Sequence, residues 1–354
     1  MTNMKFKSLI ALFTCVVFIS MAFQNSEERS VSVVGVGDIM LGTHFPSSSY
    51  LPPDNGASIF DSAVSSILSE ADCTFGNLEG SLLDEGPVVK KCSDPSKCYA
   101  FKTPTSYSHF FKDLGFDVMS LANNHVGDFG DLGRNATIKE LEKHGINYAG
   151  LLSCPKSIFE INGIRYGFAA FSPNKGTCRI TDISRATSIV KELADTADIV
   201  IVSFHGGAEG SKFEHMPRET ETFYGENRGD VYKFSHAVID AGADIVFGHG
   251  PHVTRAVELY KDRFIAYSLG NFATYGRFNL RGVNGIAPII KVHTKPDGMF
   301  LRADVYSIKQ IGEGYPRLDT TNAVFNRIKE LTLADLPETQ LEFVENQILR
   351  KDGE

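Results

Sequence analysis

Side chains that can bind a metal ion follow six apolar segments of this sequence, each directly after the segment ends. They are Asp38, Asn77, Glu79, Asn123, Asn124, His125, His205, Glu209, His249, His252 and Asn271. In parallel α/β sheets, ligands bind outside the carboxyl ends of the strands, so one such residue per strand would converge in space. A single histidine is usually structural, and it is the repetition that indicates a site. Carboxylate, carboxamide and imidazole groups without a thiolate suit a divalent Mn, Fe or Zn ion.

Such a site could perform hydrolysis. Two metal ions bridged by one carboxylate can activate a water molecule and neutralise the leaving oxygen of a phosphoester, and His125 could donate a proton to that oxygen. Each residue also has a structural alternative. Asp38 and Glu79 could cap the helices that follow them, Asn124 could form a turn, and residues 248–251 could be only a tight loop.

The elements that would position these residues alternate between strands and helices. Strands are predicted over residues 31–36, 72–77, 116–121, 146–149, 198–204, 244–247, 263–268, 286–293 and 299–308. Helices are predicted over 58–69, 107–114, 132–144, 184–196, 231–241 and, as an amphipathic terminal helix, 339–351. Asn162-Gly163 predicts a hairpin between 157–161 and 164–171. This order predicts an α/β core with partly parallel sheets and an antiparallel portion toward the C-terminus.

No composition break or long linker divides the chain. We therefore predict one domain over residues 30–310, with a C-terminal helical extension over residues 311–354 that packs on it. Residues 1–23 contain a short positive region, an uncharged apolar run and small residues near its end. This pattern is typical of a secretory signal peptide; an uncleaved N-terminal anchor, which would associate the protein with a membrane, is the alternative.

The charge of the chain argues against one class of partner. The 354 residues include 35 Lys and Arg against 43 Asp and Glu, a net charge of −8. No block of basic residues interrupts this acidity, and nucleic-acid binding normally needs a basic patch. Bound divalent cations would reverse the sign locally, so an anionic substrate stays compatible with the sequence. Several cationic side chains lie in loops near the strand ends and could contact an anionic substrate. Each could equally be only a solvated surface charge. They are Lys212, Arg218, Arg228, Arg277 and Arg281.

Export would allow disulfide bonds. Cys92 and Cys98 bracket a short polar loop that a disulfide could close, and Cys154 and Cys178 flank the predicted hairpin and could join its base. Cys73 lies in an apolar strand pattern and is predicted to be a free, buried thiol. The alternative for each cysteine is a small apolar residue in a core.

Five short motifs carry most of the ligand-type residues: residues 37–42 (GDIMLG), 77–79 (NLE), 123–125 (NNH), 248–252 (GHGPH) and 268–272 (SLGNF). In kind and order they resemble the motifs of the bacterial capsule-synthesis protein CapA family, which is linked to poly-γ-glutamate capsule biosynthesis. That family is related to the calcineurin-like metallophosphoesterases. The resemblance implies the metallophosphoesterase fold of two stacked mixed β-sheets flanked by helices, in four layers α-β-β-α.

The resemblance also implies roles for individual residues. The implied metal ligands, for one or two divalent ions, are Asp38, Glu79 as the bridging carboxylate, Asn124, His205, His249 and His252. His125 matches the proton donor or phosphate contact, and Glu209 is a second catalytic candidate. Asn77, Asn123, Asn271 and Arg277 are candidates for substrate binding, with Asn77 also the fallback for Glu79.

The sequence departs from the related patterns at four places. Phosphoesterases usually have His where this chain has Met40, and His44 in the next loop could substitute for it. The closing pair has two residues between its histidines where phosphoesterases have one. Many CapA-like chains have His and Trp where this one has Gly250 and Gly206.

Three functions fit these observations. The first is an exported metal-dependent hydrolase, of phosphoesterase type, that acts on a phosphoester or an anionic envelope polymer in the periplasm or cell envelope of a bacterium. The second is a non-hydrolytic assembly factor for a capsule polymer that keeps the fold. The third is a polymer-binding module that uses the same site.

Overall fold

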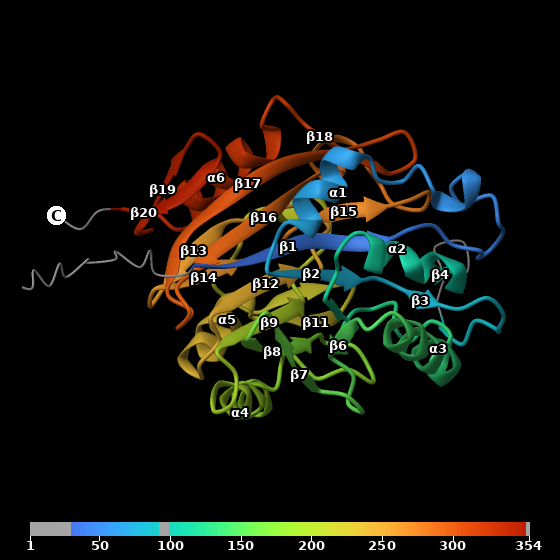
Figure 1. Cartoon of the computed structure of the whole chain (residues 1–354), viewed down its shortest axis with the longest axis horizontal. Helices are drawn as coiled ribbons and strands as arrows, with labels where there is room; N and C mark the ends of the chain where they lie inside the picture. Colours follow the sequence, from blue (N-terminus) through green and yellow to red (C-terminus); the bar gives the residue numbers. More distant parts are fainter. Residues whose placement is uncertain (1–29, 92–98, 352–354) are drawn as a thin grey trace, which may run out of the picture.

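The structure is a computed structural model, which describes residues 30–91 and 99–351. Most strands belong to two large sheets (Figure 1). The larger sheet has, in spatial order, β19 (Leu341–Val344), β20 (Gln347–Arg350), β17 (Phe300–Ile311), β16 (Ile286–Thr294), β1 (Val31–Met40), β2 (Cys73–Leu78), β5 (Val118–Ser120) and β6 (Asn147–Ala149), with β15 (Asn271–Thr274) beside β1 and β18 (Tyr315–Leu318) beside β17. The second sheet has, in order, β13 (Val257–Tyr260), β14 (Arg263–Ala266), β12 (Ile245–His249), β9 (Ile199–His205), β8 (Ile164–Phe171) and β7 (Lys156–Ile161).

Smaller elements complete the fold. Two short strand pairs are β3 (Ser81–Leu82) with β4 (Lys102–Thr103) and β10 (Glu221–Phe223) with β11 (Glu226–Gly229). The α-helices of the described residues are α1 (Ser62–Ser69), α2 (Ser108–Asp113), α3 (Gly130–Lys143), α4 (Ile183–Ala194), α5 (Val231–Asp240) and α6 (Ala323–Asp335). The predicted hairpin between β7 and β8 is confirmed, and Asn162 at its turn has a φ of 52°.

The apolar residues of β1 explain why the sheets stack. Side chains alternate between the two faces of a strand. Val31 and Val33 lie in the core between the two sheets, whereas Val34 and Val36 lie in the core under α1, α2 and α3. Helices α4 and α5 cover the outer face of the second sheet through a third apolar cluster. The predicted four layers of helices, sheet, sheet and helices are therefore confirmed.

Parallel pairing aligns the strand ends that carry the ligand-type residues. In the larger sheet, Asp38 on β1 lies opposite Asn77 on β2 and Asn271 on β15. In the second sheet, His205 on β9 lies opposite His249 on β12. Figure 1 shows the arrowheads of β1, β2 and β15 pointing to the same side of the molecule. The convergence expected from the sequence is thus produced by the register of both sheets.

The C-terminal segment differs from the prediction. Residues 339–351 form the β19–β20 hairpin instead of an amphipathic helix, so that prediction is wrong. The turn residues Glu345 and Asn346 both have positive φ, 47° and 67°, as the tight turns of two-residue hairpins require. β20 pairs with β17, and this pairing draws the segment into the larger sheet. The helical part of the extension is α6, which packs against β16 and β17.

The cysteine predictions have mixed outcomes. Cys73 is free and buried, as predicted. Cys154 and Cys178 are also free, so the candidate disulfide between them is not formed and the alternative of two separate thiols holds. Their sulfur atoms have different partners, since the Cys178 thiol faces the carbonyl of Leu151 at 3.7 Å and Cys154 accepts a contact from a serine hydroxyl. The predicted Cys92–Cys98 disulfide and the N-terminal segment 1–23 lie outside the described residues.

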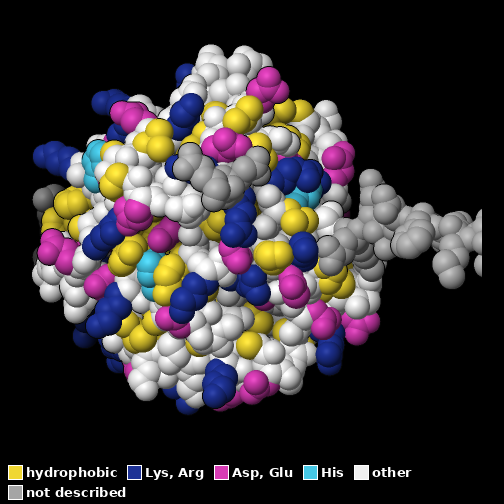
Figure 2. All heavy atoms as spheres, turned by 90° about the vertical axis from the view of Figure 1, so that its left-hand side faces the viewer, with side chains coloured by type: hydrophobic (Ala, Val, Ile, Leu, Met, Phe, Trp, Pro, Cys, Tyr) yellow, Lys and Arg dark blue, Asp and Glu magenta, His cyan; other side chains and the backbone are white. Residues whose placement is uncertain are grey.

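The face opposite the strand ends carries mixed charges. Figure 2, which views the left-hand side of Figure 1, shows basic and acidic side chains interspersed without a continuous area of either sign. Within residues 30–91 and 99–351, no helix is both long enough and apolar enough to cross a bilayer.

Candidate metal centre

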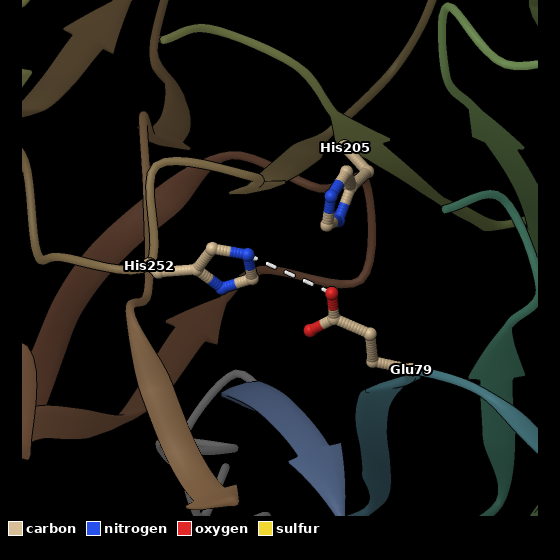
Figure 3. A group of neighbouring side chains, drawn as sticks. All are labelled: Glu79, His205 and His252. Atoms are coloured by element: carbon tan, nitrogen blue, oxygen red, sulfur yellow. Dashed lines mark ion pairs between the residues drawn. The ribbon is translucent and has the colours of Figure 1, made fainter. Parts of the chain in front are cut away.

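Three side chains from both sheets converge at the carboxyl ends of the strands. Glu79 directly follows β2, His205 ends β9, and His252 lies in the loop after β12. One ligand atom from each lies within 4.8 Å of the other two. Figure 3 shows both imidazoles facing the Glu79 carboxylate, with His252 Nε2 3.6 Å from Glu79 Oε1. We call these three residues the metal cluster.

Asp38 extends the metal cluster toward β1. Its Oδ2 lies 2.9 Å from His252 Nδ1, and its Oδ1 lies 3.3 Å from His249 Nδ1. The Asn77 side-chain amide donates a hydrogen bond of 2.7 Å to the same Oδ1. The carboxylate of Asp38 therefore contacts both histidines of the closing pair. His252 has a φ of 57°, an uncommon backbone conformation for a non-glycine residue, of the kind that clusters at functional sites.

Several buried ligand atoms at this place have no hydrogen-bond partner. They are both carboxylate oxygens of Glu79, both ring nitrogens of His205, both ring nitrogens of His249 and Oδ1 of Asn124. A buried polar atom without a partner costs about 1–3 kcal/mol, so native structures rarely leave several together. A divalent ion would satisfy one ring nitrogen of a histidine together with a carboxylate or carboxamide oxygen. The donor set therefore fits Mn, Fe or Zn.

The charges of the site are set by its burial. Burial would raise the pKa of Asp38, but the neighbouring imidazoles of His249 and His252 hold it well below its usual range. Burial raises the pKa of Glu79 well above its usual value, and the nearby Asp38 adds to this. Burial opposes the protonated form of His252, yet Glu79 and Asp38 raise its pKa to about 10. Burial holds the pKa of His205 well below its usual value, which keeps the imidazole neutral and able to ligate.

His125 lies at the edge of the metal cluster and is held by a residue that the sequence pattern did not indicate. Its Nε2 is 3.8 Å from Glu79 Oε1, and its Nδ1 is 2.7 Å from Asp128 Oδ2. Asp128 also accepts a hydrogen bond from the Phe101 amide and pairs with Lys90 at 3.1 Å. The Phe101 ring stacks on the imidazole with centroids 4.0 Å apart. The sequence does show a carboxylate three residues after His125. Asp128 does not follow a strand directly, however, so the pattern of strand ends does not indicate it.

The asparagines expected to bind substrate mainly hold the loops of the site. The Asn123 amide donates to the Leu78 carbonyl at 2.8 Å, and its Oδ1 accepts from the backbone of His125. Asn271 Oδ1 lies 3.1 Å from His252 Nδ1, and its amide donates to the carbonyls of His252 and Asn284. The contacts of Asn123 fix the position of His125, and those of Asn271 fix the position of His252.

The remaining candidates lie around the metal cluster. Glu209 is 3.0 Å from the Arg228 guanidinium, and its negative charge acts on both Glu79 and His252. Arg277 lies between the rings of two tyrosines. Arg218 pairs with a C-terminal glutamate, and Lys212 and Arg281 are exposed.

Two departures from the family pattern turn out to be neighbours. Gly250 has a φ of 113°, and a Cβ there would come within 2.5 Å of the Gly206 carbonyl oxygen. The Gly206 amide donates to the His249 carbonyl at 2.8 Å. The two glycines therefore let the loops after β9 and β12 touch, which brings their histidines together. His44, the candidate substitute at the first strand, instead faces Ser48 at 3.5 Å.

Comparison with known proteins agrees with these motifs. The family model described as bacterial capsule synthesis protein PGA_cap matches residues 32–275. The chain belongs to this family. The matched region contains all the metal-ligand candidates and Asp128.

Two curated relatives carry related names. The capsule biosynthesis protein CapA of Bacillus anthracis is 27% identical over 87% of this chain and 74% of its own length. The PGA biosynthesis protein CapA of Bacillus subtilis is 29% identical over 67% of this chain, and the match spans only 61% of that relative. Among solved structures, a putative 5'-nucleotidase from Staphylococcus aureus matches with a TM-score of 0.44 and 14% identity, over 86% of this chain and 58% of that chain.

Proposed function

We propose that this capsule-synthesis family member is an exported, divalent-metal-dependent hydrolase that acts on a phosphoester or an anionic polymer during capsule, poly-γ-glutamate or related envelope polymer biosynthesis. One observation supports this above all others. Glu79, His205 and His249 present buried oxygen and nitrogen atoms without hydrogen-bond partners at the meeting point of the two sheets. Structural histidines and carboxylates are normally hydrogen-bonded when buried.

The ligand candidates divide between the two sheets. The residues that would hold one or two ions are Asp38, Glu79, Asn124, His205, His249 and His252. When bound, Mn, Fe or Zn would supply Lewis-acid activation of a water molecule and of the substrate oxygen. The burial of these residues keeps bulk water away, which strengthens every charge interaction with the substrate.

The chain's own residues would handle the proton of the leaving group. Asp128 holds His125 through Nδ1 and leaves Nε2 directed at the metal cluster. Because Nδ1 donates its hydrogen to Asp128, Nε2 carries a proton only in the imidazolium form. Burial lowers the pKa of His125, although the Asp128 charge opposes this, and in the imidazolium form the proton would be placed to pass to a leaving oxygen. Phe101 covers one face of the imidazole and keeps it in this orientation.

Metal content and turnover test the proposal together. The purified protein should retain one or two divalent ions after dialysis and hydrolyse bis(p-nitrophenyl) phosphate. His205→Ala should lose metal and activity, whereas His109→Ala, which removes an exposed imidazole on α2, should behave as the wild type. The proposal would be contradicted if the protein retains no metal and its stability is the same with and without a chelator.

A second function, a non-hydrolytic assembly factor for a capsule polymer, is favoured by one observation. Met40 occupies the position where a phosphoesterase usually has a ligating histidine, and it is buried at the end of β1. His44 points to Ser48 and does not replace it. Retained metal without turnover of phosphoesters or γ-glutamyl amides would favour this function.

Export is part of the proposal and has its own test. If residues 1–23 are a signal peptide, the protein recovered from the periplasm or cell envelope should begin near residue 24. An intact N-terminus in the membrane fraction would indicate an anchor. Recovery of the intact chain from the cytoplasm alone would contradict export.

A further inference from the structure

Arg277 is held between two aromatic rings near the metal cluster. Its guanidinium carbon lies 4.8 Å from the ring centre of Tyr50 and 4.7 Å from that of Tyr99. Both distances are within the roughly 6 Å range of a cation–π interaction. Tyr50 belongs to the loop after β1 and Tyr99 to the segment before β4, so two separate parts of the chain form this clamp.

The guanidinium of Arg277 has no acidic partner within residues 30–91 and 99–351. Other arginines of the fold do have one. Arg255, for example, makes two hydrogen bonds of 2.8 Å to Glu221, and Arg327 makes two to Glu214. A guanidinium has five N–H donors, all in its own plane. Both tyrosine rings contact the guanidinium, and within residues 30–91 and 99–351 no acidic side chain takes its N–H donors.

The clamp is connected to the metal cluster by direct ring contacts. Phe278, the next residue, has its ring centre 5.5 Å from that of His252 and 5.1 Å from that of Phe101. Phe101 stacks in turn on His125. The segment that carries Arg277 also begins at β15, whose Asn271 contacts His252. Arg277 is therefore adjacent in sequence to Phe278, whose ring contacts His252 of the metal cluster.

We propose that Arg277, clamped by Tyr50 and Tyr99, is a carboxylate-binding subsite that selects a substrate with a carboxylate beyond the bond under attack. The subsite rests on the proposed function, because it belongs to the same site. An arginine can bind a carboxylate through two parallel hydrogen bonds, and holding the arginine in place beforehand reduces the entropy lost on binding. A carboxylate is planar and matches two parallel N–H donors of a guanidinium, and a phosphate probe in the test below distinguishes the two anions.

Calorimetric titration of the purified protein with a γ-linked glutamate trimer tests this subsite. Arg277→Gln should weaken trimer binding about 10- to 100-fold, the usual value of a charge-assisted pair. Arg277→Lys should restore little of it, because an ammonium cannot bind in a bidentate manner. Arg281→Gln, which removes an exposed arginine from the same loop, should change binding less than about twofold. Metal content should stay equal in all four proteins.

A second variant and a second ligand distinguish carboxylate binding from a general loss of positive charge. Tyr99→Leu leaves Arg277 in place but removes one face of the clamp, and it should weaken trimer binding about 3- to 10-fold. Tripolyphosphate serves as the phosphate probe. If Arg277→Gln binds the trimer as the wild type does, or weakens only tripolyphosphate, the carboxylate subsite is overturned.

The titration is repeated on protein stripped of metal, which separates this inference from the proposed function. A wild-type protein that takes up no metal would contradict the proposed hydrolase function. The difference between wild type and Arg277→Gln in trimer binding would still decide the subsite.

Discussion

Two buried charged clusters lie close together in this fold, and they differ in how their charges are satisfied. In the metal cluster, the side chains of Glu79 and His205 have no hydrogen-bond partners. In the second, which we call the arginine cluster (Arg228, Arg255, Glu209 and Glu221), Arg255 makes two hydrogen bonds to Glu221, and Arg228 binds Glu209 and a backbone carbonyl. Burial and charge are common to both. The metal cluster is therefore identified as a ligand site by its missing hydrogen-bond partners and not by its burial.

The difference predicts that the arginine cluster stabilises the fold. Arg255→Met leaves the Glu221 carboxylate buried without its guanidinium, so the free energy of unfolding should fall by about 3–5 kcal/mol, which is more than 100-fold in the folding equilibrium. Urea unfolding measures this. The double variant Arg255→Met/Glu221→Leu should recover much of the loss. If Arg255→Met is as stable as the wild type, the arginine cluster does not stabilise the fold and the two clusters do not differ in this respect.

The metal cluster should show the reverse behaviour. Glu79→Gln should weaken metal binding by at least about 100-fold, beyond the 10- to 100-fold usual for outer-shell changes. The stability of the metal-free protein should change by less than about 1 kcal/mol, because the Glu79 side chain has no hydrogen bond to lose and its contacts with His252 and His125 are 3.6 and 3.8 Å long. Metal titration and urea unfolding measure the two effects. Strong destabilisation with intact metal affinity would make Glu79 a structural residue.

His125 and Asp128 combine the two behaviours, since their pair is satisfied but adjoins the metal cluster. Asp128→Asn should lower turnover about 10- to 100-fold without loss of metal. The decrease should be larger for a phenyl phosphodiester than for bis(p-nitrophenyl) phosphate, because the poorer leaving group needs the proton more. Asp131→Asn, an exposed aspartate on α3, is the matched control. Equal decreases for both esters would argue against proton donation by His125.

The smallest effect is expected at Lys90. It lies 3.1 Å from Asp128 but its side chain is partly exposed, and such ion pairs usually contribute about 1 kcal/mol or less. Lys90→Gln should therefore lower turnover less than about fivefold and leave metal content unchanged. A decrease as large as that of Asp128→Asn would show that the pair acts as one unit.

The residues of the metal cluster were predictable because strand ends are visible in sequence. Each follows an apolar run, and parallel pairing then sets Asp38 against Asn77 and His205 against His249. Asp128 was not predicted, because it lies within a loop where nothing in the local pattern fixes its direction. The tyrosine clamp of Arg277 joins three distant segments, and no spacing in the sequence indicates it.

The C-terminal hairpin shows a different limit. Leu341, Phe343 and Ile348 are the buried apolar residues of the segment. The sequence also places Leu341, Val344 and Ile348 at the spacing of one helix face, but Val344 is exposed in the hairpin. Pairing of β20 with β17 decides between helix and hairpin, and that contact is not local. The Asn346 turn was the available signal for a hairpin.

The division of the metal ligands between the two sheets has a consequence for when an ion can bind. Asp38 and Glu79 come from the first quarter of the chain, whereas His252 is 214 residues from Asp38. Neither sheet alone presents the full set, so an ion would be acquired only after the sheets have docked. Because protein ligands discriminate poorly among first-row metals, the metal supply of the compartment in which folding finishes would choose the ion. A protein folded in the cytoplasm of an expression host could therefore carry a different metal from the same protein folded after export.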